Sequence, residues 1–300
     1  MILLTGSNGF LGRVIYEHFK YTHSVITLSR TNADIEVDLS QQVPILGDES
    51  YEMIIHCAGK AHLVPKTEVE KQLFYLVNTQ GTKNLLRAID LQSIKPKYFV
   101  LISTVAVYGL DVGIDLDENN PLKAQEPYGH SKVLVEQEVI KWGKKNNVCI
   151  SILRLPLVVG ENPPGNLGSM QKSIQKGYYL SIKKGAVQKS MVLAKDVAYA
   201  VEQVAIVGGI YNLTDRYHPT FQELEKAISM RFNKRTPLRI PYWFAYFIAL
   251  LGDFINIFIG KKFPLDSNTL RKITNPLTFS DSKAQKAFGW APRKVLDFYK

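Results

Sequence analysis

The 300 residues suffice for two domains or for one large α/β unit, and 46% hydrophobic with 21% charged residues is typical of a packed globular protein rather than a disordered chain. The net charge of +10 comes from scattered Lys and Arg, so nucleic-acid binding is not expected, and anionic nucleotides or a membrane surface are better partners. No basic and apolar leader precedes the first strand, and Cys57 and Cys149 have no metal or disulfide spacing. We therefore expect a cytoplasmic protein without a signal peptide or a metal site.

A glycine-rich turn follows the first expected strand, residues 1–5, and leads into an expected helix over residues 10–20. The glycines lie at G-x-x-G-x-x-G spacing. In such a turn the backbone N–H groups and the dipole of the following helix point at a bound pyrophosphate. This pattern predicts a dinucleotide site made by Gly6, Ser7, Gly9, Phe10, Leu11 and Gly12.

Strands and helices alternate along most of the remaining chain. Further strands are expected at 24–28, 52–56, 98–103, 148–154 and 209–213, and further helices at 73–91, 128–145 and 194–207. This alternation predicts an α/β fold with a Rossmann-type, doubly wound parallel sheet. The pattern loosens over 160–189 and turns to short helices from residue 218. We expect a dinucleotide-binding domain of residues 1–159 and about 190–217, and a smaller, mostly helical substrate domain of 160–189 and 218–300.

The tip of the second strand carries Ser29 and Arg30 and no carboxylate. NAD-selective sites usually hold the ribose diol with an acidic residue there, whereas an arginine can meet the 2′-phosphate of NADP. The alternative is a solvated arginine in a loop. The cofactor is therefore expected to be NADP or NAD, with a modest preference for NADP.

Polar and small residues follow two central strands, where ligands of open α/β sheets bind. The strand at 52–56 ends in small residues that include Ala58 and Gly59, and the strand at 98–103 ends in hydroxyls, of which Thr104 can orient a reacting oxygen. These hydroxyls could instead satisfy local backbone groups. Asn78 lies in the next helix and is expected near the cofactor or bonded to the backbone across the sheet.

Tyr128 and Lys132 are spaced i and i+4, which places them on one face of the expected helix. A phenol titrates near pKa ~10, and a neighbouring ammonium stabilises its ionised form. Tyr128 is therefore a candidate general acid and base for an alcohol or carbonyl substrate. A tyrosine and a lysine at this spacing are common by chance. The assignment therefore depends on the accompanying Thr104 at the end of the preceding strand.

Residues 240–259 form a long, aromatic-rich stretch with basic flanks. A membrane span needs about 20 apolar residues, and Asp253 and Asn256 lie inside this one. We expect a lid helix or surface helix, with a helix lying on the membrane surface as the alternative. Membrane contact is expected to be peripheral at most.

With these motifs in order, the chain resembles an extended short-chain dehydrogenase/reductase of the NAD-dependent epimerase/dehydratase family. The resemblance implies Thr104, Tyr128 and Lys132 as catalytic residues and Asp38 as the residue that holds the adenine. Beyond the glycine turn, the expected cofactor-binding residues are Arg30, Asp38, Leu39, Ala58, Gly59, Asn78, Tyr128, Lys132 and Leu155.

The resemblance also implies an anionic substrate, a nucleotide sugar. Its expected binding residues are His62, Asn166, Leu167, Lys189 and Arg271. Lys189 stands where many relatives have an arginine, and Leu157 stands where the family's hexose 4-epimerases have an asparagine. The second departure resembles a branch that includes reductases of UDP-linked 4-keto sugars.

We therefore expect an enzyme that reduces a UDP-linked 4-keto sugar in surface-polysaccharide synthesis. The alternatives are a UDP-sugar 4-epimerase that retains NAD, a dehydrogenase of 3β-hydroxysteroids or lipid alcohols, and an NADP-sensing protein without turnover. The intact set of Thr104, Tyr128 and Lys132 argues against the last. Family resemblance also leaves a homodimer open, through helices beside the Tyr128 helix.

Overall fold

A parallel seven-stranded sheet with strand order β3-β2-β1-β4-β5-β7-β11 forms the centre of the molecule. The computed structural model describes residues 1–61, 64–183, 187–259 and 265–300. The strands of this sheet are β1 (Ile2–Thr5), β2 (Val25–Ser29), β3 (Ile35–Glu36), β4 (Met53–His56), β5 (Tyr98–Thr104), β7 (Cys149–Leu155) and β11 (Gly209–Asn212). The expected doubly wound Rossmann-type sheet is confirmed, and the order reverses between β1 and β4, where such folds bind ligands.

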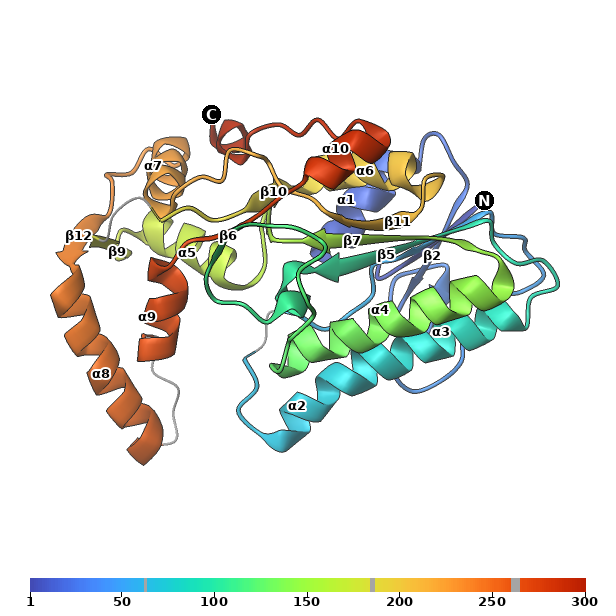
Figure 1. Cartoon of the computed structure of the whole chain (residues 1–300), viewed down its shortest axis with the longest axis horizontal. Coiled ribbons are helices and arrows are strands. Elements are labelled where there is room, and N and C mark those ends of the chain that lie inside the picture. The colour runs from blue at the N-terminus through green and yellow to red at the C-terminus, as the bar shows by residue number, and fades with distance from the viewer. Residues whose placement is uncertain (62–63, 184–186, 260–264) are drawn as a thin grey trace.

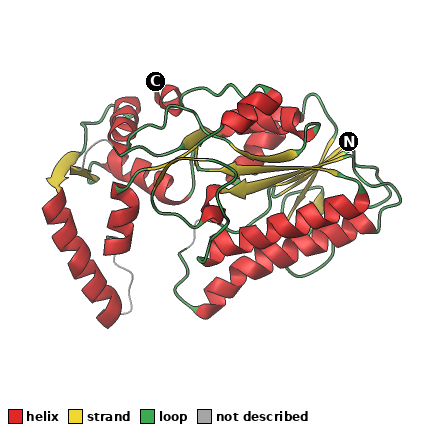
Figure 2. Ribbon diagram, viewed as in Figure 1, coloured by secondary structure: helices red, strands yellow, loops and turns green. Residues whose placement is uncertain are grey.

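Helices cover both faces of this sheet (Figures 1 and 2). One layer consists of α1 (Phe10–Phe19), α6 (Ala194–Ala205) and α10 (Ser282–Phe288), and the other of α3 (Gly81–Asp90) and α4 (Pro127–Asn146). Strand residues alternate between the layers: Val100 and Ile102 pack under α1 and α6, while Phe99 and Leu101 pack under α3 and α4. Both faces are buried, which explains the unbroken apolar runs in these strands.

The helix expected over residues 73–91 is longer and less regular than its sequence pattern suggests. It comprises α2 (Glu68–Phe74), a π-helical turn η1 (Tyr75–Gln80) and α3. Such π-helical turns insert an extra residue into a helix and are frequent at functional sites. Here the turn carries the buried Asn78.

A smaller body lies beyond the carboxyl ends of the strands, at the left of Figure 1. It contains α5 (Gly165–Lys176), α7 (Phe221–Arg231), α8 (Tyr242–Ile259), α9 (Ser267–Thr274) and the short helix η3 (Val295–Tyr299). Three two-stranded parallel sheets join segments distant in sequence: β8 (Leu157–Val159) with β10 (Met191–Leu193), β9 (Leu180–Lys183) with β12 (Leu238–Pro241), and β6 (Gly113–Leu116) with β13 (Leu277–Phe279). Helix α10 and Trp290 return to the core of the central sheet.

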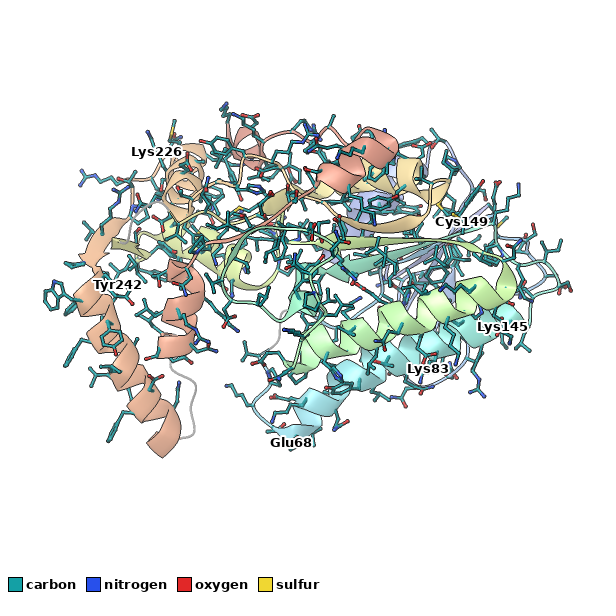
Figure 3. The ribbon with its side chains drawn as sticks, in the orientation of Figure 1. Glu68, Lys83, Lys145, Cys149, Lys226 and Tyr242 are labelled. Carbon is teal, nitrogen blue, oxygen red and sulfur yellow. The ribbon has the colours of Figure 1, made fainter. Side chains whose placement is uncertain are left out.

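Helix α8 is the segment over which the sequence left two interpretations. Among the described helices, none combines the length and hydropathy needed to cross a bilayer. Helix α8 packs beside α9 at the edge of the molecule, and its side chains spread outward from Tyr242 onward (Figure 3). The structure therefore places it as a surface helix.

Candidate active site

The glycine turn joins β1 to α1 and lies against the residues that follow β4. Gly6 has φ +71°, and a Cβ atom there would lie 2.6 Å from the backbone nitrogen of Ala58. A Cβ atom on Gly12 would lie 2.1 Å from the carbonyl oxygen of Gly6. Side chains are therefore excluded at both positions. Gly9 caps α1 without a side-chain hydrogen bond, which leaves the first N–H groups of the helix open to a phosphate.

Residues at the tip of β2 border this turn. The Ser29 hydroxyl accepts hydrogen bonds from Ser7 Oγ (3.4 Å) and from the backbone N–H of Asn8 (3.5 Å). Asp34, the nearest acidic residue in sequence, is tied back to Thr27, where its carboxylate accepts from the backbone N–H (2.8 Å) and the hydroxyl (2.7 Å). Arg30 is exposed at the tip.

Asp38 and Leu39 follow β3 near the helix layer. One Asp38 carboxylate oxygen accepts from the backbone N–H of Ser40 (2.9 Å) and from its hydroxyl (2.6 Å), which fixes a tight turn. The carbonyl of the buried Leu39 accepts from Asn84 Nδ2 (2.7 Å). The loop expected to meet the adenine is thus held from both sides.

A chain of hydrogen bonds holds the end of β4. The Thr82 hydroxyl donates to the carbonyl of Asn78 (2.7 Å), so it accepts from Nε2 of His56 (2.9 Å). Nδ1 of His56 then accepts from the Thr5 hydroxyl (2.7 Å), which itself accepts from the backbone N–H of Ala58 (3.2 Å). Burial lowers the pKa of His56 to about 3, so the ring is neutral and acts as a structural bridge.

Asn78 fastens the loop after β4 to helix α4. Its carboxamide accepts from the backbone N–H of Lys60 (2.6 Å) and donates to the carbonyl of Lys60 (3.2 Å) and to Ser131 Oγ (2.9 Å). Gly59 lies within the same corner: a Cβ atom there would lie 3.2 Å from Asn78 Oδ1 and 3.3 Å from Lys132 Nζ. Asn78 therefore positions the loop through the backbone of Lys60, in keeping with the backbone-bonding alternative.

Thr104, Tyr128 and Lys132 lie together where β5 meets α4. The Thr104 side chain lies close enough to the Tyr128 hydroxyl to act on its pKa, and Lys132 is buried with its Nζ donating to the carbonyl of Ile102 (3.0 Å). A Cβ atom at Gly129 would lie 2.6 Å from the carbonyl oxygen of Ala106, so α4 sits tightly on the turn after β5. This close approach brings the tyrosine to the threonine.

Burial raises the pKa of Tyr128, and the Thr104 side chain opposes that rise. The expectation that Lys132 lowers the phenol's pKa is not met in this structure, because the ammonium binds the Ile102 carbonyl. Burial also lowers the pKa of Lys132, with Glu136 opposing that shift. Tyr128 is therefore a neutral phenol that can donate a proton.

A buried ion pair that sequence reasoning missed supports this trio. Arg154 on β7 binds Glu136 on α4 through Nη2 (2.7 Å) and Nε (3.1 Å), and the Ser103 hydroxyl donates to Glu136 Oε1 (2.5 Å). Arg154 also donates to the Tyr108 hydroxyl (3.0 Å). Glu136 lies one further i+4 step beyond Lys132 on the same helix, and that spacing is the signal that could have found it.

The expected substrate residues lie on the smaller body and differ in character. Leu167 is buried in that body's core beside Met170 and Ile174, so its side chain is a core residue and only its backbone can meet a ligand. Asn166 is exposed at the start of α5. His62 lies outside the described residues.

Arg271 forms an ion pair with Asp111, whereas Lys189 forms none among the described residues. Arg271 Nη2 binds Asp111 Oδ2 (2.9 Å), and Lys272 lies 3.8 Å from the other oxygen. Asp111 also acts electrostatically on Lys189, whose pKa burial lowers to about 8. Within the described part of the chain no hydrogen bond or ion pair engages the ammonium of Lys189. A half-buried cation without a partner is suited to an anionic ligand.

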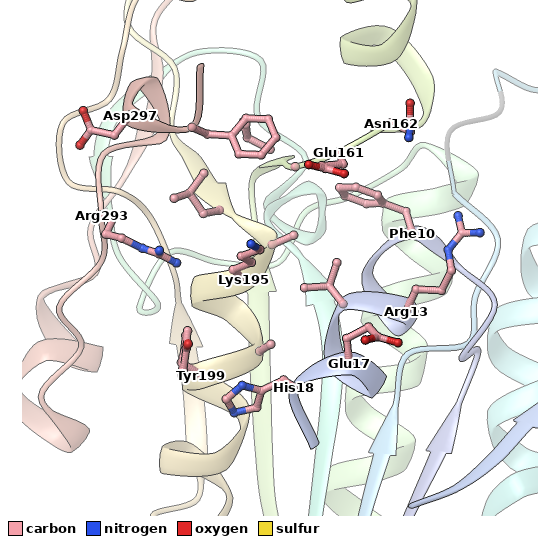
Figure 4. Close-up of a pocket in the computed structure, with 17 residues that line it drawn as sticks. Phe10, Arg13, Glu17, His18, Glu161, Asn162, Lys195, Tyr199, Arg293 and Asp297 are labelled. Atoms are coloured by element: carbon pink, nitrogen blue, oxygen red, sulfur yellow. The ribbon is translucent and has the colours of Figure 1, made fainter. Parts of the chain in front are cut away.

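A separate pocket of about 870 Å³ opens between α1, α6 and the C-terminal segment. Figure 4 shows Phe10, Arg13 and Glu17 on the α1 side of the pocket and Lys195 and Tyr199 on the α6 side. None of Thr104, Tyr128 and Lys132 lines this pocket. It adjoins the glycine turn through Phe10 and lies away from the reacting groups.

The glycine turn, the open N–H groups of α1 and the buried lysine fit a nicotinamide dinucleotide, and the hydroxyl pair at the end of β5 fits an alcohol or ketone beside it. Fold and site thus define a dinucleotide-dependent enzyme of the Rossmann class. The sequence profile described as the NAD dependent epimerase/dehydratase family matches residues 2–213. The chain belongs to this family.

Two relatives match along nearly the whole chain. The N-acetyl-alpha-D-glucosaminyl-diphospho-ditrans,octacis-undecaprenol 4-epimerase of Escherichia coli O157:H7 is 25% identical, over 97% of this chain and 90% of its own length. The UDP-glucose 4-epimerase of Vibrio cholerae is 23% identical, over 98% of this chain and 92% of its own length.

Solved structures share the fold. The Thermotoga maritima UDP-glucose 4-epimerase with UDP-glucose has a TM-score of 0.76 and 18% identity, covering 100% of this chain and 96% of that one. A Pseudomonas aeruginosa protein complexed with NADPH has a TM-score of 0.74 and 19% identity, covering 99% and 96%. The chain is thus an NAD(P)-dependent enzyme of the epimerase/dehydratase family.

Proposed function

We propose that this enzyme interconverts the two C4 epimers of a sugar whose anomeric oxygen carries a diphosphate, with a UDP-sugar as the substrate. The observation that carries the proposal is the pairing of two sites. Tyr128, with the Thr104 side chain beside it, supplies proton transfer at the strand ends, and Lys189 supplies a half-buried cation on the smaller body. Both relatives named above carry 4-epimerase names.

The chain's own residues account for the proton chemistry. Thr104 holds the sugar hydroxyl beside Tyr128. The ionised oxygen of Tyr128 takes the proton as the alcohol becomes a ketone, and the phenol so formed returns it as the alcohol reforms. Lys132 is fixed by its hydrogen bond to the Ile102 carbonyl, and Asn78 holds the loop after β4 to helix α4 through Ser131. When bound, NAD or NADP supplies the hydride acceptor and donor. Gly6–Gly12 would hold its phosphates, and Ser29 and Arg30 would face the adenosine ribose.

A second candidate function, net reduction of a UDP-linked 4-keto sugar, is favoured by the tip of β2. Arg30 is exposed there, and the nearby Asp34 is engaged by Thr27. An arginine at this point suits NADP, and a reductase needs a fresh reduced cofactor each cycle. The surface-polysaccharide role remains part of this proposal.

One experiment separates the two candidates. The purified enzyme is incubated with UDP-glucose or UDP-N-acetylglucosamine, without added cofactor, and the C4 epimer is measured by chromatography. Conversion to an equilibrium mixture by wild type, and none by Tyr128→Phe, supports the epimerase. Consumption of NADPH with a UDP-4-keto sugar, without epimer formation, supports the reductase. A parallel incubation with polyprenyl-diphosphate-linked N-acetylglucosamine tests the carrier: conversion of that substrate alone would contradict UDP as the carrier.

A further inference from the structure

Helix α8 buries small residues and exposes large ones, the reverse of a helix in a globular core. Ala245 and Ala249 are 0% exposed, and Gly252 is also buried. These three positions follow one another at i, i+4 and i+7, so they form a single narrow stripe. Ala245 and Ala249 pack with Leu270 of α9, and Ile182, Ile240 and Leu265 pack around them. The buried face thus serves close approach of two helices and leaves the bulk of the side chains outside.

The two polar side chains that argued against a membrane role both turn toward α9. Asp253 Oδ1 accepts from the backbone N–H of Ser267 (3.1 Å), at the start of α9. Asn256 Nδ2 donates to Asp266, the residue that caps α9, over 3.4 Å. Asp253 is the single charged residue in Tyr242–Ile259. Its inward direction leaves the outer surface of the described helix without a charge.

That outer surface is a continuous apolar face of aromatic and leucine side chains. Trp243 is 71% exposed, Phe247 57% and Phe254 60%. The full set of large exposed residues on the helix, hereafter the α8 face, is Tyr242, Trp243, Phe244, Tyr246, Phe247, Leu250, Leu251 and Phe254. Exposed contiguous apolar surface of this kind marks an interaction site, because exposure to water is costly without a partner.

Basic residues flank the α8 face. Lys234, Arg235 and Arg239 are exposed just before the helix. Lys261 and Lys262 follow it in the sequence, outside the described residues. Two copies of this chain pairing in parallel through the α8 face would set the basic residues before the helix against each other. An anionic lipid surface instead complements those flanks and takes up the apolar side chains.

We propose that α8 docks the enzyme on an anionic lipid bilayer, lying in the plane of the interface with the α8 face inserted among the acyl chains. Trp and Tyr side chains favour this boundary, where an apolar ring and a polar edge meet different surroundings. The helix is 18 residues long, roughly 27 Å, and lies flat rather than crossing. The inference does not depend on which sugar reaction the site performs.

Vesicle flotation tests the proposal with matched variants. Wild type should float with vesicles of phosphatidylcholine and phosphatidylglycerol at 7:3, and less with pure phosphatidylcholine. The variant Trp243→Ser/Phe247→Ser/Phe254→Ser should lose at least ~tenfold in partitioning, because three large apolar side chains no longer insert. The control Tyr21→Ser/Ile45→Ser/Leu91→Ser removes apolar residues elsewhere that are even more exposed, and it should float like wild type. Replacing Arg235 or Arg239 by Gln should weaken binding about fivefold each.

Tryptophan fluorescence gives an independent readout from the unmodified protein. Of the three tryptophans, Trp142 and Trp290 are buried, so Trp243 reports on the α8 face. Its emission should shift to the blue on adding anionic vesicles and become protected from acrylamide. A wild type that stays with the lipid-free fraction, or an α8 triple variant that floats equally well, would overturn the proposal. A lipid-independent blue shift that grows with protein concentration, with a doubled mass by light scattering, would assign the face to a second copy instead.

Discussion

Helices α4 and α8 depart in opposite ways from the usual pattern of burial, because α4 buries charged side chains and α8 exposes apolar ones. Helix α4 carries Lys132 and Glu136 into the interior, where each meets a partner from a neighbouring strand. Helix α8 turns its aromatic side chains to solvent and buries alanines. Each inversion is costly, because buried charge must be paired and exposed apolar surface must be hydrated. A fold that keeps a feature with such a free-energy cost points to a function for it. We assign proton chemistry to α4 and docking to α8.

The largest effect should come from the single hydroxyl of Tyr128. Tyr128→Phe removes the proton donor and should lower kcat by ~10²–10⁴-fold, while cofactor affinity stays within a few-fold. Tyr75→Phe is the matched control. It removes a tyrosine hydroxyl that hydrogen-bonds His130 (3.1 Å), a residue on the helix that carries Tyr128. Steady-state rates with a UDP-sugar and cofactor titrations measure both. A near-normal rate for Tyr128→Phe would remove this residue from the mechanism.

The buried ion pair of α4 should dominate stability. Arg154→Met leaves the carboxylate of Glu136 buried without its partner, which should cost about 3–5 kcal/mol of unfolding free energy in urea titrations. The double variant Glu136→Leu/Arg154→Met should recover part of that loss. Lys97→Met breaks the exposed pair with Glu52 and should have a far smaller effect. Equal losses of unfolding free energy in Arg154→Met and Lys97→Met would contradict the claim that the buried ion pair matters more for stability than the exposed one.

The sequence predicted the dinucleotide half well because its signals are local. A strand, a glycine turn and the helix beginning at Phe10 are encoded within residues 1–20, and the predicted strand ends lie within a residue or two of those observed. Short pairings such as β8 with β10 were not predictable, because three-residue segments carry no period and acquire their structure from a partner distant in sequence. The π-helical turn at Asn78 depends on tertiary contacts in the same way.

The candidate site was predictable where residue type and spacing carry the chemistry. Tyr128 and Lys132 could be named from one helix, whereas Glu136 and Arg154 are joined only by the packing of α4 on β7. The sequence of α8 is apolar except for Asp253 and Asn256, and hydropathy alone would turn these two side chains to solvent. The structure instead places them and the small residues toward α9 and leaves the aromatics outside.

Lys189 should make diphosphate binding depend on pH. Its pKa of about 8 means that the ammonium loses its proton as pH rises through that value, so UDP affinity should be full below about pH 7 and fall above pH 8. Lys189→Ala should weaken UDP binding roughly tenfold to a hundredfold, as expected for a charge-assisted hydrogen bond, and leave NADP binding alone. Lys189→Arg keeps its charge and should flatten the profile. Calorimetric titration of UDP from pH 6.5 to 9.5 measures this dependence. A wild-type affinity that does not change with pH would exclude Lys189 from UDP binding.

Arg30 should set the choice of cofactor if it meets the 2′-phosphate of NADP. Arg30→Ala should then weaken NADPH by about 1.5–3 kcal/mol and leave NADH unchanged. Arg13→Ala, on the outer side of α1, is a control for loss of positive charge near the turn. Fluorescence titration of both cofactors measures the difference. A wild-type preference for NADH, or equal loss of both, would favour the solvated-loop alternative.

The smallest effects should reveal the inverted packing of α8 directly. Trp243→Ser removes a large side chain that contacts little protein, so the unfolding free energy should change by no more than about 0.5 kcal/mol. Ala249→Leu adds bulk to the stripe that packs on Leu270, which should cost ~1–3 kcal/mol although leucine forms helices well. Thermal unfolding without lipid compares the two. The reverse result, a costly Trp243→Ser and a harmless Ala249→Leu, would mean that α8 packs through its aromatic face in solution, and the docking surface would then be unavailable to a bilayer.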